Sequence, residues 1–210
     1  MNLKEFEIEF SKLGNNYKTK DIDKLNKTLI KNKKDVSCLK NIILNKQEYH
    51  RTYFQVSLSK LNTIEEQLNF IENNFELLQD WWHVDQLPQF LKKIPNELAY
   101  EKAKEYINNE MPFARRWGYV LWMPTLVKDK NNFENIKKLF KDDNEYYVQM
   151  VEAWLISYMA IYHTEETLEY LKTKPLNYEI TGKAIQKILD SFRIKKEDKE
   201  KFKKIRNLYK

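Results

Sequence analysis

The chain has 210 residues, a formal net charge of +6 and a hydrophobic fraction of 42%, which is enough to bury a sizeable core. Its 3 Gly and 5 Pro leave little material for the tight turns of an all-β fold, and its single cysteine excludes intrachain disulfides and a cysteine-rich zinc site. No apolar run approaches the roughly 20 residues of a membrane-spanning helix, and the N-terminal residues lack the layout of a signal peptide. We therefore expect a soluble cytoplasmic protein.

Apolar residues recur with a period near 3.6 along almost the whole chain, which is typical of amphipathic helices. No segment alternates apolar and polar residues for long enough to predict a strand. Asn62 or Thr63 can cap a helix whose first turn holds Glu65 and Glu66, and Pro88 should interrupt the helix in which it lies. The helical segments predicted in the first half are 3–13, 22–30, 36–44, 49–61, the one that begins after residue 62 or 63, and 81–91.

In the second half, Pro112 suits the first turn of a helix that runs to about residue 127, with a bend near Pro124. The other helices predicted there are 97–108, 132–141, 145–162, 164–173, 178–192 and 196–208. These helices form pairs of about 30 to 40 residues, the size of the repeats in helical solenoids. The predicted fold is therefore all-α, a HEAT-like helical-repeat solenoid with a concave face. We expect one domain over 1–210, with divergent N-terminal helices (1–61), a repeat core (62–192) and a basic C-terminal helix (193–210).

The net charge is concentrated at the end of the chain. Residues 193–210 hold nine Lys or Arg and three Asp or Glu, while the other residues hold 28 basic and 28 acidic groups. Such a segment could bind a polyanion, with an affinity that falls as salt rises. A solvated terminal helix explains the same charges equally well.

Residues 80–85, Asp-Trp-Trp-His-Val-Asp, are the strongest candidate for a functional site. In a helix, Trp81 and Asp85 lie on the same side, one turn apart. An indole face beside a carboxylate can hold a cationic group, because both attract positive charge. The structural alternatives are that Asp85 only stabilises a helix N-terminus and that Trp81 or Trp82 is a core residue, since the two lie about 100° apart. We expect His83 to be a partly exposed structural histidine.

Four stretches together resemble the DNA alkylation repair family of HEAT-like DNA glycosylases. They are residues 80–85, residues 113–120 with Arg116, residues 146–154 with Trp154, and residues 183–193. They occur in the family's order and cover about residues 63–194, whereas the first 60 residues are at best weakly similar. The resemblance implies hydrolysis of the N-glycosidic bond of alkylated purines in double-stranded DNA, without a metal or an organic cofactor.

The resemblance also implies a role for four side chains. Asp85 would be catalytic, stabilising an oxocarbenium-like sugar and orienting water. Trp81 and Trp154 would contact the lesion nucleotide, and Arg116 would hold a backbone phosphate. We expect these four to converge on one concave, electropositive surface.

Each of these roles has a structural alternative. Trp154 lies among apolar residues and on its own pattern would belong to the core, while Arg116 would serve only an ion pair. The second hypothesis is therefore a catalytically silent HEAT-like scaffold that binds DNA or protein.

Overall fold

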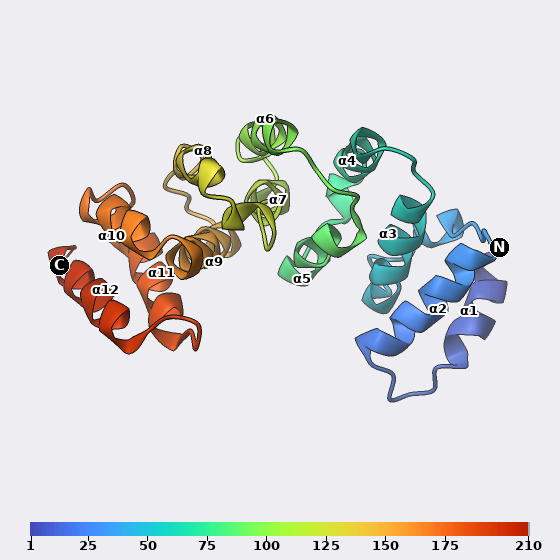
Figure 1. Cartoon of the computed structure of the whole chain (residues 1–210). Coiled ribbons are helices and arrows are strands. Elements are labelled where there is room, and N and C mark those ends of the chain that lie inside the picture. Colours follow the sequence, from blue (N-terminus) through green and yellow to red (C-terminus); the bar gives the residue numbers. More distant parts are fainter. Residues whose placement is uncertain (210) are drawn as a thin grey trace. The chain divides into compact units, whose positions relative to one another are not determined.

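The computed structural model describes residues 1–209, and in this part of the chain every regular element is a helix and none is a strand. The all-α prediction is therefore confirmed. The chain divides into two compact units, of which unit 1 is Met1–Ile94 and unit 2 begins at Pro95. The labels of Figure 1 are used below for the helices of each unit.

Unit 1 is built around buried side chains such as Phe6, Phe54 and Leu68, none of which is exposed to solvent. The predicted cap is confirmed at Thr63, whose hydroxyl accepts a hydrogen bond from the Glu66 amide (3.1 Å) while the Glu66 carboxylate accepts one from the Thr63 amide (3.2 Å). The helices of this unit are α1 (Leu3–Ser11), α2 (Thr19–Lys31), α3 (His50–Ser59), α4 (Ile64–Glu72) and α5 (Trp81–Asp85), with 3₁₀ turns at Ser37–Leu39, Gln47–Tyr49, Phe75–Leu77 and Leu87–Phe90.

The helix predicted at 36–44 is wrong, because that segment forms one 3₁₀ turn followed by further turns. Val36, Leu39 and Ile43 are fully buried there, so their apolar spacing reflects burial without a continuous helix. The interruption predicted at Pro88 is confirmed. Helix α5 ends at Asp85, and a 3₁₀ turn with Pro88 near its start follows, since proline has no amide hydrogen to continue the ladder.

In unit 2 each helix packs against those near it in sequence. Helix α6 contacts α7, α7 contacts α9, α9 contacts α10 and α11, and α12 contacts α10 and α11, which is the nearest-neighbour packing of a helical solenoid. The helix after Pro112 ends at Val120, several residues earlier than predicted. The helices are α6 (Asn96–Tyr106), α7 (Pro112–Val120), α8 (Phe133–Lys137), α9 (Tyr146–Tyr162), α10 (Thr164–Lys172), α11 (Tyr178–Asp190) and α12 (Lys196–Leu208), with 3₁₀ turns at Leu126–Lys128 and Lys130–Asn132.

Helices α6 and α7 approach each other closely at Gly118. A Cβ atom at this position would lie 2.7 Å from Cγ2 of Ile107 and 3.2 Å from the carbonyl oxygen of Ala103. Glycine is therefore required for this contact, because a side chain would force the two helices apart. The contact fixes α7, which carries Arg116.

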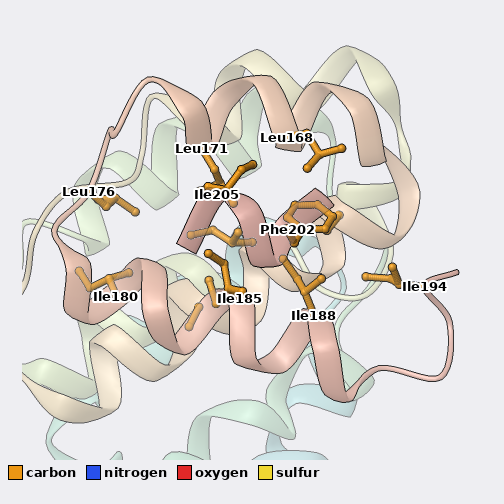
Figure 2. Packing of buried hydrophobic residues seen from close by; sticks show 13 residues of the cluster. Leu168, Leu171, Leu176, Ile180, Ile185, Ile188, Ile194, Phe202 and Ile205 are labelled. Atoms are coloured by element: carbon orange, nitrogen blue, oxygen red, sulfur yellow. The ribbon is translucent and has the colours of Figure 1, made fainter. Parts of the chain in front are cut away.

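The basic C-terminal helix α12 is packed into the core of unit 2. Figure 2 shows Phe202 and Ile205 among apolar residues of α10 and α11 such as Leu171 and Ile188. Phe202 is 0% exposed and Ile205 is 2% exposed. Removing α12 would therefore expose core side chains, so the effect of its charge has to be tested by substitution of its surface lysines.

Candidate nucleic-acid site

Trp81 and Asp85 line the same open cavity in unit 1, which has a volume of about 610 Å³. The indole of Trp81 is 48% exposed, and Asp85 is half-buried one turn further along α5. Residues from α2, the turn before α3, α3 itself and the turn after α5 complete the cavity. The residues that line it are Tyr17, Lys18, Thr19, Ile22, Glu48, Arg51, Trp81, Trp82, Asp85, Gln86 and Gln89.

The structural alternative for Asp85 was that it only stabilises the N-terminus of a helix, and Asp85 does not do so in α5. The residue that caps α5 is Asp80, whose side chain accepts a hydrogen bond from the Trp81 amide at 2.7 Å. Asp85 is the last residue of this five-residue helix, where the helix dipole disfavours a negative charge. Capping of α5 is therefore the role of Asp80 and not of Asp85.

The two tryptophans of α5 differ in their surroundings, as their angular separation predicts. Trp81 faces solvent and the cavity, whereas Trp82 is half-buried against two histidines. Its ring makes edge contacts with His83 at 4.2 Å and with His50 at 5.5 Å, measured between ring centroids. Trp82 thus anchors α5, while Trp81 is available to a ligand.

Arg51, which the sequence analysis did not single out, organises the wall of the cavity. Its guanidinium forms a two-point ion pair with Asp23 (2.7 and 3.1 Å) and lies over the ring of Phe90 at 4.9 Å. It also donates to the side-chain oxygens of Gln86 (3.1 Å) and Gln89 (3.4 Å). Because Asp23 balances its charge, Arg51 contributes rigidity to the cavity more than positive potential.

Behind this wall lies a stacked pair of buried histidines. The rings of His50 and His83 have centroids 3.7 Å apart and are inclined by 7°. The expectation of a partly exposed His83 is wrong, because its side chain is 1% exposed. Burial lowers the pKa of His83 to about 4, and burial together with His83 lowers the pKa of His50 to about 3.

Hydrogen bonds fix the tautomer of both rings. Nε2 of His50 donates to the carbonyl of Leu77 (3.1 Å), and Nδ1 accepts from the Gln86 amide (3.0 Å). Nδ1 of His83 accepts from the Gln79 backbone amide at 3.1 Å, and its Nε2 is buried without a hydrogen-bond partner among residues 1–209. Burial and these hydrogen bonds therefore favour the neutral form of both histidines in the folded protein.

In unit 2, Trp154 lies on α9 and lines a second cavity, of about 390 Å³. Its ring makes an edge contact with Tyr158 at 5.8 Å, and it is half-buried, so it is not a fully enclosed core residue. The other lining residues come from α9, α11 and the loop after α11. They are Ser157, Tyr158, Ile161, Lys187, Asp190, Ser191 and Arg193.

Arg116 is only 4% exposed and lines neither of these two cavities. One of its terminal nitrogens donates to the backbone carbonyl of Tyr147 at 2.6 Å, so the side chain connects α7 with α9. Its neighbour Arg115 forms a two-point ion pair with Asp143 (2.7 and 3.2 Å). The structure thus places Trp81 with Asp85 in one cavity of unit 1, and places Trp154 and Arg116 at two different positions of unit 2.

The first 60 residues, in which the sequence analysis singled out no site residue and found at best a weak resemblance to the family, contribute much of the unit 1 cavity. Tyr17, Lys18 and Glu48 belong to them. The sequence marks them only by their position at or near the start of helical segments, where side chains of neighbouring helices meet.

In residues 1–209 no group of three or more His, Cys, Asp or Glu side chains is placed to hold a metal ion. No helix of that range is long and apolar enough to span a membrane.

Comparison with known proteins identifies the family of the chain. No curated protein and no solved structure is a significant match. Residues 10–188, however, match the family of DNA alkylation repair enzymes. This range includes every residue that lines the unit 1 cavity, and it includes the lining of the unit 2 cavity as far as Lys187. The match extends well beyond the stretch 63–194 at its N-terminal side and takes in α2 and α3, which complete the cavity around Asp85. The chain therefore belongs to the DNA alkylation repair enzyme family.

Proposed function

We propose that this protein is a DNA glycosylase that hydrolyses the N-glycosidic bond of alkylated purines in double-stranded DNA. One observation carries the proposal: an exposed indole, Trp81, and a carboxylate, Asp85, line the same open cavity. Membership of the DNA alkylation repair family supports a role in DNA repair.

The chemistry follows from the charge of the substrate. A purine alkylated at N3 or N7 is cationic and is already a good leaving group. Catalysis must then stabilise the sugar as it becomes oxocarbenium-like and must supply water, and a nearby carboxylate can do both. Asp85 is the proposed catalytic residue, and the π face of Trp81 favours the same positive charge.

The electrostatics of the unit 1 cavity suit such a substrate. Four charged side chains line it: Lys18, Glu48, Arg51 and Asp85. Asp23 balances Arg51, and the other charged groups of the lining are the ammonium of Lys18 and the carboxylates of Glu48 and Asp85. A carboxylate in the lining attracts a cationic base, and the proposed reaction uses neither a metal nor an organic cofactor.

In unit 2, Trp154 and Arg116 are proposed to contact DNA. Trp154 offers a half-buried indole beside a cavity, which suits contact with a nucleotide or its deoxyribose. Arg116 is proposed to hold a backbone phosphate, a contact for which this side chain, 4% exposed and bound to the Tyr147 carbonyl, has to turn toward the DNA.

The test is release of 7-methylguanine and 3-methyladenine from methylated duplex DNA, measured by chromatography of the freed bases. We expect Asp85→Asn to lower the rate by about 100-fold or more while DNA binding is kept, because the amide cannot stabilise the positive sugar. The matched control is Glu65→Gln, which should keep full activity. Glu65 is an exposed carboxylate in the first turn of α4. Equal rates for Asp85→Asn and the wild type would refute the role of Asp85.

A catalytically silent scaffold that binds DNA or protein is the alternative, and the burial of Arg116 counts against the phosphate contact that the glycosylase proposal assigns to it. A guanidinium that is 4% exposed and bonded to a backbone carbonyl has little surface to offer a phosphate. This alternative predicts that the wild-type protein binds methylated duplex DNA but releases no base from it.

A separate prediction concerns the surface lysines of the C-terminal helix. Lys195, Lys196 and Lys204 are exposed, so their replacement by glutamine should leave the core of unit 2 intact. We expect the triple variant to bind duplex DNA more weakly and the slope of log affinity against log salt to fall by up to about 2.7. The control variant replaces Lys4, Lys27 and Lys31 of unit 1, which changes the net charge equally. An identical slope in both variants would mean that only the net charge matters.

A further inference from the structure

The loop between α11 and α12 exposes an aromatic ring completely. Phe192 is 102% exposed, whereas Phe6, Phe54 and Phe202 are fully buried. A single exposed apolar side chain is ordinary on a protein surface, but a fully exposed ring presents both of its faces for stacking on another π system. Whether Phe192 has a ligand is therefore decided by its neighbours.

The fold holds this loop in place on both sides of Phe192. The Ser191 amide donates to the carbonyl of Ile188 (3.3 Å), and the Arg193 amide donates to the Ser191 hydroxyl (3.2 Å). Ile194 is 7% exposed and belongs to the apolar cluster of unit 2, as Figure 2 shows. Phe192 is thus presented to solvent by a fixed backbone, which lowers the entropy cost of binding.

The next residue, Arg193, is positioned by two tyrosines of α9. Its guanidinium donates to the hydroxyl of Tyr162 at 2.6 Å. It also lies over the ring of Tyr162 (4.9 Å) and that of Tyr158 (5.6 Å). Arg193 stays on the surface and lines the cavity that contains Trp154. A planar guanidinium held in this way suits two-point binding of a phosphate.

Basic side chains are more frequent than acidic ones close to Phe192 in the sequence. Residues 183–196 contain five Lys or Arg and one Asp, although Lys183 pairs with Glu179 (2.7 Å) and Glu197 and Asp198 follow directly. Such a surface attracts a polyanion, and a ring next to a phosphate-binding group is the arrangement that proteins use to bind unpaired nucleic acid, with bases stacked on aromatic side chains.

We propose that Phe192 stacks on an unpaired base of DNA while Arg193 binds the adjoining phosphate. The protein then prefers DNA with an unpaired base over fully paired duplex. This inference goes beyond the proposed function, because it concerns recognition of an unpaired base and needs no bond to be hydrolysed.

The test compares two fluorescein-labelled duplexes of the same sequence, one fully paired and one with a single unpaired thymine, by fluorescence anisotropy with the full-length protein. We expect the wild type to bind the bulged duplex more tightly than the paired one. Phe192→Ala should lower the affinity for the bulged duplex by about 10-fold and leave the affinity for the paired duplex unchanged. Phe192→Trp should keep the preference. Tyr178→Ala is the matched control, because Tyr178 is 45% exposed at the opposite end of α11, and it should bind like the wild type.

Arg193→Gln separates the two roles within the loop. It should weaken binding to both duplexes and lower the salt slope by about one, as expected for the loss of a phosphate contact. With 5-iodouracil at the unpaired position, irradiation should cross-link the base to the peptide that contains Phe192.

Equal affinity of the wild type for the two duplexes, or a cross-link to a different peptide, would overturn the proposal. The outcome is independent of the glycosylase test. Base release can fail while Phe192 still selects the bulged duplex, and Asp85 can be catalytic while Phe192→Ala binds normally.

Discussion

Replacing Glu152 with glutamine should raise the free energy of unfolding of unit 2 at about pH 8 by about 2–4 kcal/mol and have little effect near pH 4.5. Glu152 lies on α9 and is 0% exposed. One of its oxygens accepts a long hydrogen bond from the Lys141 amide (3.3 Å), and the other has no hydrogen-bond partner within residues 1–209. This carboxyl is therefore held in a site that disfavours its charge.

The pH dependence follows from the direction of the pKa shift. Burial raises the pKa of Glu152 from 4.5 to about 8. The nearby Tyr119 hydroxyl, whose proton goes to the Leu139 carbonyl, and the Lys141 amide offset this only in part. Between these two values the unfolded chain ionises the group and the folded chain keeps it protonated. The folded state thus holds the extra proton, and its stability falls as the pH rises.

Glutamine resembles the protonated acid in shape and cannot ionise, so Glu152→Gln should remove this loss. Urea unfolding at several pH values, followed by hydrogen exchange of α9 peptides, measures the difference. The control is Glu169→Gln on α10, where the carboxylate is exposed and pairs with Lys172. A stabilisation by Glu152→Gln that does not change with pH would contradict the explanation.

Unit 1 should respond to pH in the opposite direction, losing roughly 3 kcal/mol of its free energy of unfolding between about pH 7 and about pH 5. The cause is the stacked pair of His50 and His83, whose pKa values are lowered to about 3 and about 4. Between about pH 6.5 and these values the unfolded chain takes up protons that the folded chain excludes. Acid therefore favours unfolding.

The hydrogen bonds make this exclusion specific. Protonation would place a new N–H of His50 against the Gln86 amide group and one of His83 against the Gln79 amide, which are both donors. Gln86 cannot turn its oxygen toward His50 without presenting its NH₂ group to Arg51, to which that oxygen now binds. Protonation would thus disturb the wall behind the Asp85 cavity.

Hydrogen exchange followed by mass spectrometry can report α3 and α9 separately as the pH is lowered. We expect protection of α3 to fall with acid, and His83→Phe, which keeps a stacked ring, to reduce that dependence by about half. His163→Phe, a substitution of the buried histidine of unit 2, should leave the α3 profile unchanged. Full protection of α3 at about pH 5 in the wild type would rule out the mechanism.

Local patterns were sufficient to predict most helices and one part of the site. The cap at Thr63 and the interruption at Pro88 depend on groups within a few residues of each other. The same holds for Trp81 and Asp85, because one helical turn places them on one side of α5. The segment 36–44 was predicted wrongly, because apolar spacing reports burial and does not by itself distinguish a helix from successive turns.

The sequence by itself determined the all-α class, the order of the helices and the pairing of an indole with a carboxylate on α5. Only the tertiary structure decided that Arg51 and the start of α2 complete the cavity, that His83 and Arg116 are buried, and that Phe192 is exposed. The physical reason is that helical geometry is set by hydrogen bonds between residues four apart. Burial is set by side chains that arrive from distant parts of the chain, and the sequence of one segment does not contain their positions.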